Sequence, residues 1–193
     1  MENLNDIWTR SGTTVPYPGL VQSEDTCVFV SIAGAINHLV NTTITEQHIK
    51  SIWEADGRPQ ANFGLALKYL SPEMAAHSIL VERFHDREEP LPSVDVIFDA
   101  LNDGAVVIPS FQLATGTPDC LTRVPRWHML SLFCLQHGQS QVWDTNDKTG
   151  FISESDIRSL FTVNVRPIPY PPLGYLVSHD QHEAIIVTRK KNA

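Results

Sequence analysis

The stretch that decides the fold is Gln22-Ser-Glu-Asp-Thr-Cys27-Val-Phe-Val-Ser-Ile-Ala-Gly-Ala-Ile-Asn-His-Leu39. Asp25 and Thr26 are good helix caps, so Cys27 is predicted to lie in the first turn of a helix. Small and apolar residues then recur with the spacing of one buried helix face, namely Val28, Ile32, Ala35 and Leu39. Unpaired N–H groups and the positive end of the helix dipole favour a thiolate at such a position, and the thiolate is the form that attacks carbonyl groups.

Gln22 lies five residues before the cysteine. Its side-chain amide could donate to the place where an oxyanion grows during acyl transfer. Free cysteines are among the most buried residue types, so an ordinary core cysteine is the alternative interpretation of Cys27. A catalytic role therefore requires a base elsewhere in the chain.

His128 is the candidate base. Two apolar runs, 127–135 and 141–144, are separated by a short turn that contains Gly138, which predicts a β-hairpin. His128 is expected to open the first strand and Asp144 to close the second, so the hairpin brings the carboxylate towards the imidazole, where it could hold the tautomer. Because the register is not set by the sequence, Asn146 is the alternative to Asp144.

Gln22, Cys27, His128 and Asp144 in this order resemble the papain-like cysteine peptidases, particularly the bacteriocin leader-peptidase type. The resemblance covers about residues 20–161. It implies an α+β papain-like fold in which a helical half led by Cys27 packs on an antiparallel sheet that carries His128. The site would then lie in the groove between the two halves.

The whole chain, residues 1–193, is predicted to form a single domain. Residues 1–21 are expected to be an N-terminal arm, 22–161 the core that carries the site, and 162–193 the C-terminal part, with strands at 174–177 and 184–188. Further helices are predicted at 45–53 and 93–103, and a strand at 105–111. The segment 112–127 contains Gly and Pro without periodicity, which predicts a long loop that lines the substrate cleft.

Composition narrows the possible partners. The chain has 193 residues, 42% of them hydrophobic, a formal net charge of −8 and a pI near 5.4, which argues against nucleic acid and anionic membranes as partners. No apolar run is long enough to span a membrane and no signal-peptide pattern is present, so we expect a cytoplasmic protein or one exported without a cleaved signal, such as a secreted effector. The sequence does not indicate the oligomeric state.

No cofactor is expected, because the predicted chemistry requires none and the three cysteines show no metal-ligand spacing. His179 and His182 could form a metal-binding turn, but no third ligand is indicated and a solvated hairpin tip is favoured. Cys120 and Cys134 are interpreted as a loop thiol and a core residue of a strand.

The predicted reaction is acyl transfer from an amide. Cys27 attacks the carbonyl, Gln22 and the backbone N–H of Cys27 hold the oxyanion, and His128, oriented by Asp144, protonates the leaving amine and then activates water. A protein or peptide is the expected substrate, with a thiol peptidase as the first choice and a glutamine deamidase or transglutaminase-like effector as the alternative. From a different class, the chain could be a catalytically inactive binding module with the same fold.

Overall fold

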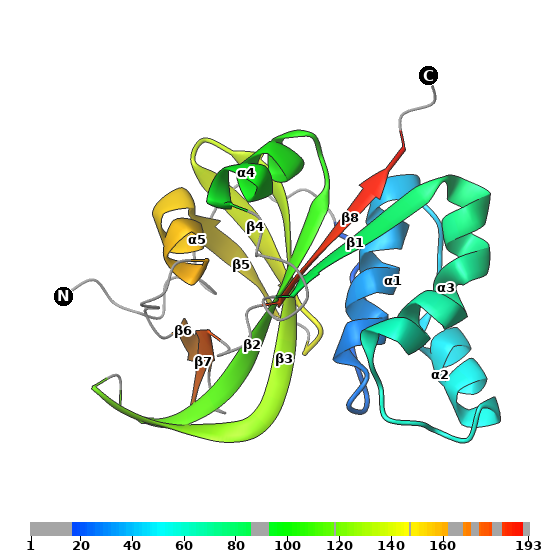
Figure 1. Cartoon of the computed structure of the whole chain (residues 1–193), viewed down its shortest axis with the longest axis horizontal. Helices are drawn as coiled ribbons and strands as arrows, with labels where there is room; N and C mark the ends of the chain where they lie inside the picture. Colours follow the sequence, from blue (N-terminus) through cyan, green and yellow to red (C-terminus); the bar gives the residue numbers. More distant parts are fainter. Residues whose placement is uncertain are drawn as a thin grey trace.

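The computed structural model describes residues 17–85, 93–117, 119–146, 148–161, 168–170, 174–178 and 183–190, and these form an α+β architecture around an antiparallel sheet (Figure 1). The helices are α1 (Cys27–Val40), α2 (Glu46–Ala55), α3 (Phe63–His77), α4 (Val94–Asn102) and α5 (Glu154–Leu160). The strands are β1 (Ile79–His85), β2 (Val106–Thr117), β3 (Cys120–Gln136), β4 (Gln139–Asp144), β5 (Lys148–Ser153), β6 (Ile168–Tyr170), β7 (Gly174–Ser178) and β8 (Glu183–Arg189).

Two hydrophobic cores lie on opposite faces of the sheet. One core joins α1, α2 and α3 to the sheet and includes Phe29 of α1. The other joins α4 and α5 to the sheet and includes Phe111 and Leu130 of β2 and β3. Figure 1 shows α1, α2 and α3 together on one side of the strands and α4 and α5 on the other side. We call these the helical-half core and the α4–α5 core.

The helix predicted from the deciding stretch is confirmed as α1, and every residue from Val28 to Asn37 is buried. Asn37 ends this buried run with a side chain that both donates to Ile44 O (2.9 Å) and accepts from Ile44 N (2.8 Å). These two bonds satisfy a buried amide and hold the connection to α2 in place, as burial of a polar group requires. The predicted helices at 45–53 and 93–103 are confirmed as α2 and α4, capped by Thr45 and Ser93.

The predicted cleft loop at 112–127 is wrong. Strand β2 continues to Thr117 and β3 begins at Cys120, so the segment is a long antiparallel hairpin. Gly116 has φ 117° and the backbone of Cys120 lies where its Cβ would be, so only glycine permits this close approach. Pairing with β3 and β7 supplies the ladder that local propensity does not predict. As a result, His128 lies in the middle of β3 and does not open it.

The hairpin of β3 and β4 is confirmed. Its turn contains His137 (φ 50°) and Gly138 (φ 74°), and two positive φ values in succession match the right-handed twist of the flanking strands. The register pairs Leu130 with Asp144, and β4 ends at Asp144 as predicted. Strand β5, which pairs with β4, has no counterpart in the sequence prediction.

The two predicted C-terminal strands are confirmed as β7 and β8. The main sheet has the order β1-β8-β2-β3-β4-β5, so β8 lies between β1 and β2 in the interior of the sheet. Its apolar residues are accordingly buried on both faces: Ile185 and Val187 belong to the helical-half core, and Ile186 belongs to the α4–α5 core.

Candidate active site

His128 and Asp144 form a close pair at the end of β4. Nε2 of His128 and Oδ1 of Asp144 are 2.7 Å apart, and the two residues are only 4% and 0% exposed. The same carboxylate oxygen accepts a second hydrogen bond from the backbone N–H of Asn146 (2.8 Å). A histidine whose Nε2 faces a buried carboxylate in this way has a defined tautomer and ring orientation.

Gln22 lies beside this pair because two hydrogen bonds connect segments that are far apart in the sequence. The backbone N–H of Gln22 donates to the carbonyl oxygen of Thr145 (2.8 Å), and its side-chain Nε2 donates to Oδ1 of Asn146 (3.3 Å). Asn146 Nδ2 in turn lies 3.4 Å from His128 Nε2. The loop that leads into Cys27 is therefore attached to the turn that follows Asp144.

Cys27 is the first residue of α1 and is half-buried. Burial raises the pKa of its thiol to about 11, although the backbone N–H groups of Val28 and of Cys27 itself act in the opposite direction, and the carboxylates of Asp25 and Asp144 raise the pKa further. The prediction that the helix start favours a thiolate is thus wrong for this arrangement. Desolvation of the charged form outweighs the helix N–H groups, because thiolate hydration is lost on burial.

The predicted cap of α1 also needs correction. Thr26 is the N-cap by position, but its side chain accepts no hydrogen bond from the helix. Its backbone φ and ψ of −113° and 17° do not have the extended conformation that usually directs a cap oxygen at the first N–H groups. The backbone N–H groups of Val28 and Cys27 instead lower the pKa of the Cys27 thiol, though less than burial raises it.

The strand register decides on which face His128 and Asp144 lie. His128 is opposite Phe111 and Asp144 is opposite Leu130, and directly opposed residues of antiparallel strands project to the same face. This is the face of the α4–α5 core, whereas Cys27 packs against the helical-half core. Within the described parts of the chain, no hydrogen bond joins the Cys27 sulfur to His128.

The structure therefore brings together Gln22, His128, Asp144 and Asn146, and it places Cys27 within electrostatic range of Asp144. Sequence reasoning considered Asn146 only as a substitute for Asp144. It did not predict that Asp144 and Asn146 both lie against His128. It also did not predict the backbone hydrogen bond from Gln22 to Thr145. No local pattern signals either contact, because each depends on two segments that meet only in the folded chain.

A groove of about 430 Å³ opens next to these residues and is lined by Gln22, Ser23, Glu24, Asp25, Trp53 and Asn146. Glu24 holds the loop of residues 22–25 in place, because its carboxylate pairs with Lys50 (2.6 Å) and Arg58 (3.1 Å). Ser23 is fixed as well, since its N–H and hydroxyl both donate to Glu46 Oε1 (2.6 and 2.8 Å). The groove is thus a polar opening beside Gln22 and Asn146.

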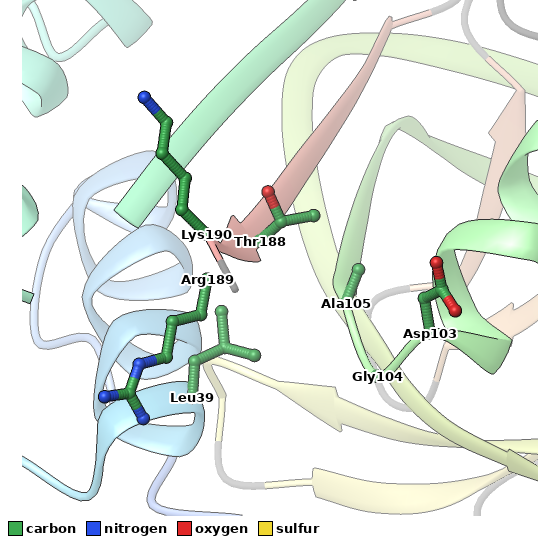
Figure 2. Close-up of a pocket in the computed structure, with 7 residues that line it drawn as sticks. All are labelled: Leu39, Asp103, Gly104, Ala105, Thr188, Arg189 and Lys190. Carbon is green, nitrogen blue, oxygen red and sulfur yellow. The ribbon is translucent and has the colours of Figure 1, made fainter. Parts of the chain in front are cut away.

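A second cavity of about 610 Å³ lies at the other end of α1. Figure 2 shows that the side chains of Arg189 and Lys190 point away from each other and from Asp103, so the cavity does not gather its charges around one point. It contains no arrangement of side chains that resembles a reactive site.

The other predicted ligands and thiols can be placed only in part. The turn with His179 and His182 and the arm residues 1–16 lie outside the described residues. In the parts that the structure describes, no three His, Cys, Asp or Glu side chains are grouped to hold a metal ion. Cys120 is exposed at the start of β3, which corrects its loop assignment, and Cys134 is half-buried within β3.

No helix in the same described parts is long and apolar enough to cross a membrane.

No protein-family model matches the sequence, and no curated protein matches it either. A solved structure with similarity is that of the Pseudomonas avirulence protein AvrPphB, with a TM-score of 0.31 and 10% sequence identity over 74% of this chain and 68% of that chain. Overlap at this level carries no argument about function.

Proposed function

We propose that this protein is a cysteine-dependent amide hydrolase of the papain-like superfamily, with Cys27 as nucleophile, His128 as base and Asp144 as the residue that orients the base. The observation that supports the proposal most is the buried pair of His128 Nε2 and Asp144 Oδ1 at 2.7 Å. It lies next to the loop that carries Gln22 and leads into Cys27. No subfamily is proposed, and the bacteriocin leader-peptidase type has no support from the comparisons.

The pKa of Cys27 defines how the reaction would begin. With a pKa of about 11 the resting sulfur is a thiol at neutral pH, so its proton must leave as the sulfur attacks. Nε2 of His128 faces Asp144, and the other ring nitrogen, Nδ1, is the atom that would take this proton. Asp144 would then stabilise the imidazolium. Substrate binding has to bring Nδ1 and the sulfur together, as catalytic hydrogen bonds often tighten only in the substrate complex.

The remaining steps follow the chemistry of acyl transfer. As the C–S bond forms, the carbonyl oxygen becomes an oxyanion that the Gln22 amide would stabilise. The imidazolium gives its proton to the leaving nitrogen while the C–N bond breaks, which leaves a thioester on Cys27. Water, deprotonated by His128, then attacks the thioester and returns the thiol and a carboxylic acid.

The substrate is proposed as a protein or peptide amide, which the groove of about 430 Å³ beside Gln22 and Asn146 could receive. Cleavage of a peptide bond is the first choice. Deamidation or transamidation of a glutamine side chain uses the same residues and is the alternative. Residence in the cytoplasm or export as an effector remains a prediction of the sequence.

A catalytically inactive binding module is the second candidate, because one specific observation favours it. Cys27 has a raised pKa and no hydrogen bond to His128 in the described parts of the chain. In that case the groove would bind a peptide without cutting it, and the buried His128–Asp144 pair would be structural.

The test is intact-mass analysis of candidate proteins and peptides after incubation with the full chain, with Cys27→Ala as the inactive variant. Cys134→Ala is the matched control, since Cys134 is also half-buried but lies in β3 within the helical-half core. Fragments that form with the wild type and with Cys134→Ala, but not with Cys27→Ala, establish a peptidase. The mass gain of a deamidated glutamine establishes the alternative. Equal turnover by Cys27→Ala rejects both.

A further inference from the structure

Asn146 contacts three other members of the candidate site. Its backbone N–H donates to Asp144 Oδ1 (2.8 Å), its side-chain nitrogen lies 3.4 Å from His128 Nε2, and its side-chain oxygen lies 3.3 Å from Gln22 Nε2. It is therefore the link between the His128–Asp144 pair and the proposed oxyanion donor.

Matching of donors and acceptors determines how the Asn146 amide must be turned. The Asp144 carboxylate offers only acceptors, so His128 Nε2 carries the proton across the 2.7 Å contact. An amide nitrogen is also only a donor. A nitrogen of Asn146 towards Nε2 would therefore bring two donors together at 3.4 Å, whereas the amide oxygen at this position would accept from the same N–H as Asp144 does. Nitrogen and oxygen of an amide differ little in size, so hydrogen-bond matching assigns them.

The orientation of the Gln22 amide depends on that of Asn146. With its oxygen towards His128, Asn146 presents its nitrogen to Gln22, which must then offer an acceptor. The Gln22 oxygen is buried and has no hydrogen-bond partner among the described residues, while Gln22 Nε2 is the atom directed at Asn146. Exchange of nitrogen and oxygen in both amides gives the Gln22 oxygen a donor. It also moves the Gln22 NH₂ group to the buried position that the oxygen otherwise occupies.

We infer that Asn146 is a positioning residue whose side-chain oxygen accepts from His128 and whose side-chain nitrogen donates to Gln22, so that the Gln22 NH₂ group is directed to the oxyanion. The role rests on the proposed function for its use in catalysis, but the hydrogen-bond arrangement does not. Asn146 acts together with Asp144 and does not replace it. A donor directed at the reacting carbonyl has its greatest effect once negative charge develops on the oxygen.

The arrangement is tested first without any substrate, by proton–nitrogen NMR of the ¹⁵N-labelled full chain. The side-chain NH₂ signals of the two residues are identified by their loss in Asn146→Asp and in Gln22→Met. If Asn146 donates to Gln22, the hydrogen-bonded NH₂ group whose protons exchange slowly with water belongs to Asn146. Its protons then exchange fast in Gln22→Met. A protected NH₂ on Gln22, or protection on neither residue, overturns the inference whether or not the protein is an enzyme.

Kinetics then test its consequence on an amide substrate whose turnover depends on Cys27. In Asn146→Asp the new carboxylate can only accept, so Gln22 turns its NH₂ group towards it and away from the oxyanion. We expect kcat to fall about as far as in Gln22→Ala, on the order of a hundredfold or more, with little change in KM. The double variant should be no slower than Gln22→Ala alone, because the two changes act through one interaction.

Asn102→Asp is the matched control. It introduces the same charge change at an exposed position of α4, on an element that contributes nothing to the site, and should leave kcat unchanged. Strictly multiplicative losses in the double variant would show that Asn146 does not act through Gln22, even if both residues matter. Turnover that does not depend on Cys27 would reject the proposed function, and the NMR result would still stand.

Discussion

The two sides of the candidate site differ in how far they are prepared for chemistry. On the sheet side, Asp144 Oδ1 already accepts from His128 and from the backbone of Asn146. On the helix side, Cys27 has a pKa of about 11, and the buried hydroxyl of Thr26 has no hydrogen-bond partner in the part of the chain that the structure describes. Paired strands hold their side chains through a continuous ladder of backbone bonds, while the start of a helix has none before it. The His128–Asp144 pair is therefore held by the sheet, whereas burial keeps the pKa of the Cys27 thiol raised.

Removal of the Asp144 carboxylate, on the sheet side of the site, is expected to have the largest effect on turnover and stability. Asp144→Ala is expected to lower turnover about ten-thousand-fold, since the imidazole loses the group that holds its tautomer. It should also lower the free energy of unfolding by about 1–3 kcal/mol, as expected when a buried hydrogen-bond donor loses its acceptor. Chemical denaturation and single-turnover kinetics measure the two effects separately.

The control for this variant is Asp99→Ala, which removes an exposed carboxylate from α4. It should change neither quantity. An Asp144→Ala protein that folds as stably as the wild type would show that the pair with His128 contributes little to the structure. Unchanged turnover in a folded variant would remove Asp144 from the mechanism.

Gln22→Ala tests the connection between the two sides. We expect kcat to fall by about a hundred- to a thousandfold, because an oxyanion donor acts only as charge develops. The stability should stay within about 0.5 kcal/mol, since only one side-chain bond at the edge of the site is lost. Gln60→Ala, at an exposed position before α3, serves as the control. If KM rises instead and kcat is retained, Gln22 binds the ground state and is no oxyanion donor.

Alkylation by iodoacetamide measures the helix side directly. A pKa of about 11 instead of the ordinary value of 9.0 lowers the thiolate fraction of Cys27 about a hundredfold near neutral pH. The exposed Cys120 should therefore react first, as followed by peptide mass spectrometry. Because the thiol is the acid form, the rate at Cys27 should rise about tenfold for each pH unit and level off only near pH 11. A plateau below pH 8 would mean that a thiolate exists in the resting protein.

Gly19→Ala is expected to have the smallest effect and concerns the attachment of the helix-side loop to β4. A Cβ at Gly19 would overlap the ring of Trp143, so the variant should be less stable by about 1–3 kcal/mol. The matched control is Gly34→Ala within α1, where the new methyl group would make ordinary contacts with Gly19 Cα and Tyr17 at 3.5 Å. There the better helix propensity of alanine should preserve or increase stability. Urea denaturation compares the two, and equal behaviour would show that the loop can shift away from Trp143.

The sequence alone determined the elements that depend on short-range patterns. The apolar spacing after Cys27 predicts α1, and short-range helix patterns predict α2 and α4, which Thr45 and Ser93 cap in the structure. The turn at Gly138 predicts the hairpin that ends at Asp144. Each of these signals lies within a few residues of the structure that it specifies, so no distant contact is needed to interpret it.

The tertiary structure alone decided the rest. The long pairing of β2 with β3 overrode the glycine and proline signals of the predicted loop, and β8 entered the middle of the sheet from the end of the chain. The hydrogen bond from Gln22 to Asn146 joins residues 124 positions apart. The raised pKa of Cys27 follows from its burial in the folded chain, which the neighbouring sequence does not specify. Strand register and desolvation both depend on contacts between distant parts of the chain. A local sequence pattern contains information only about residues close to one another in the chain.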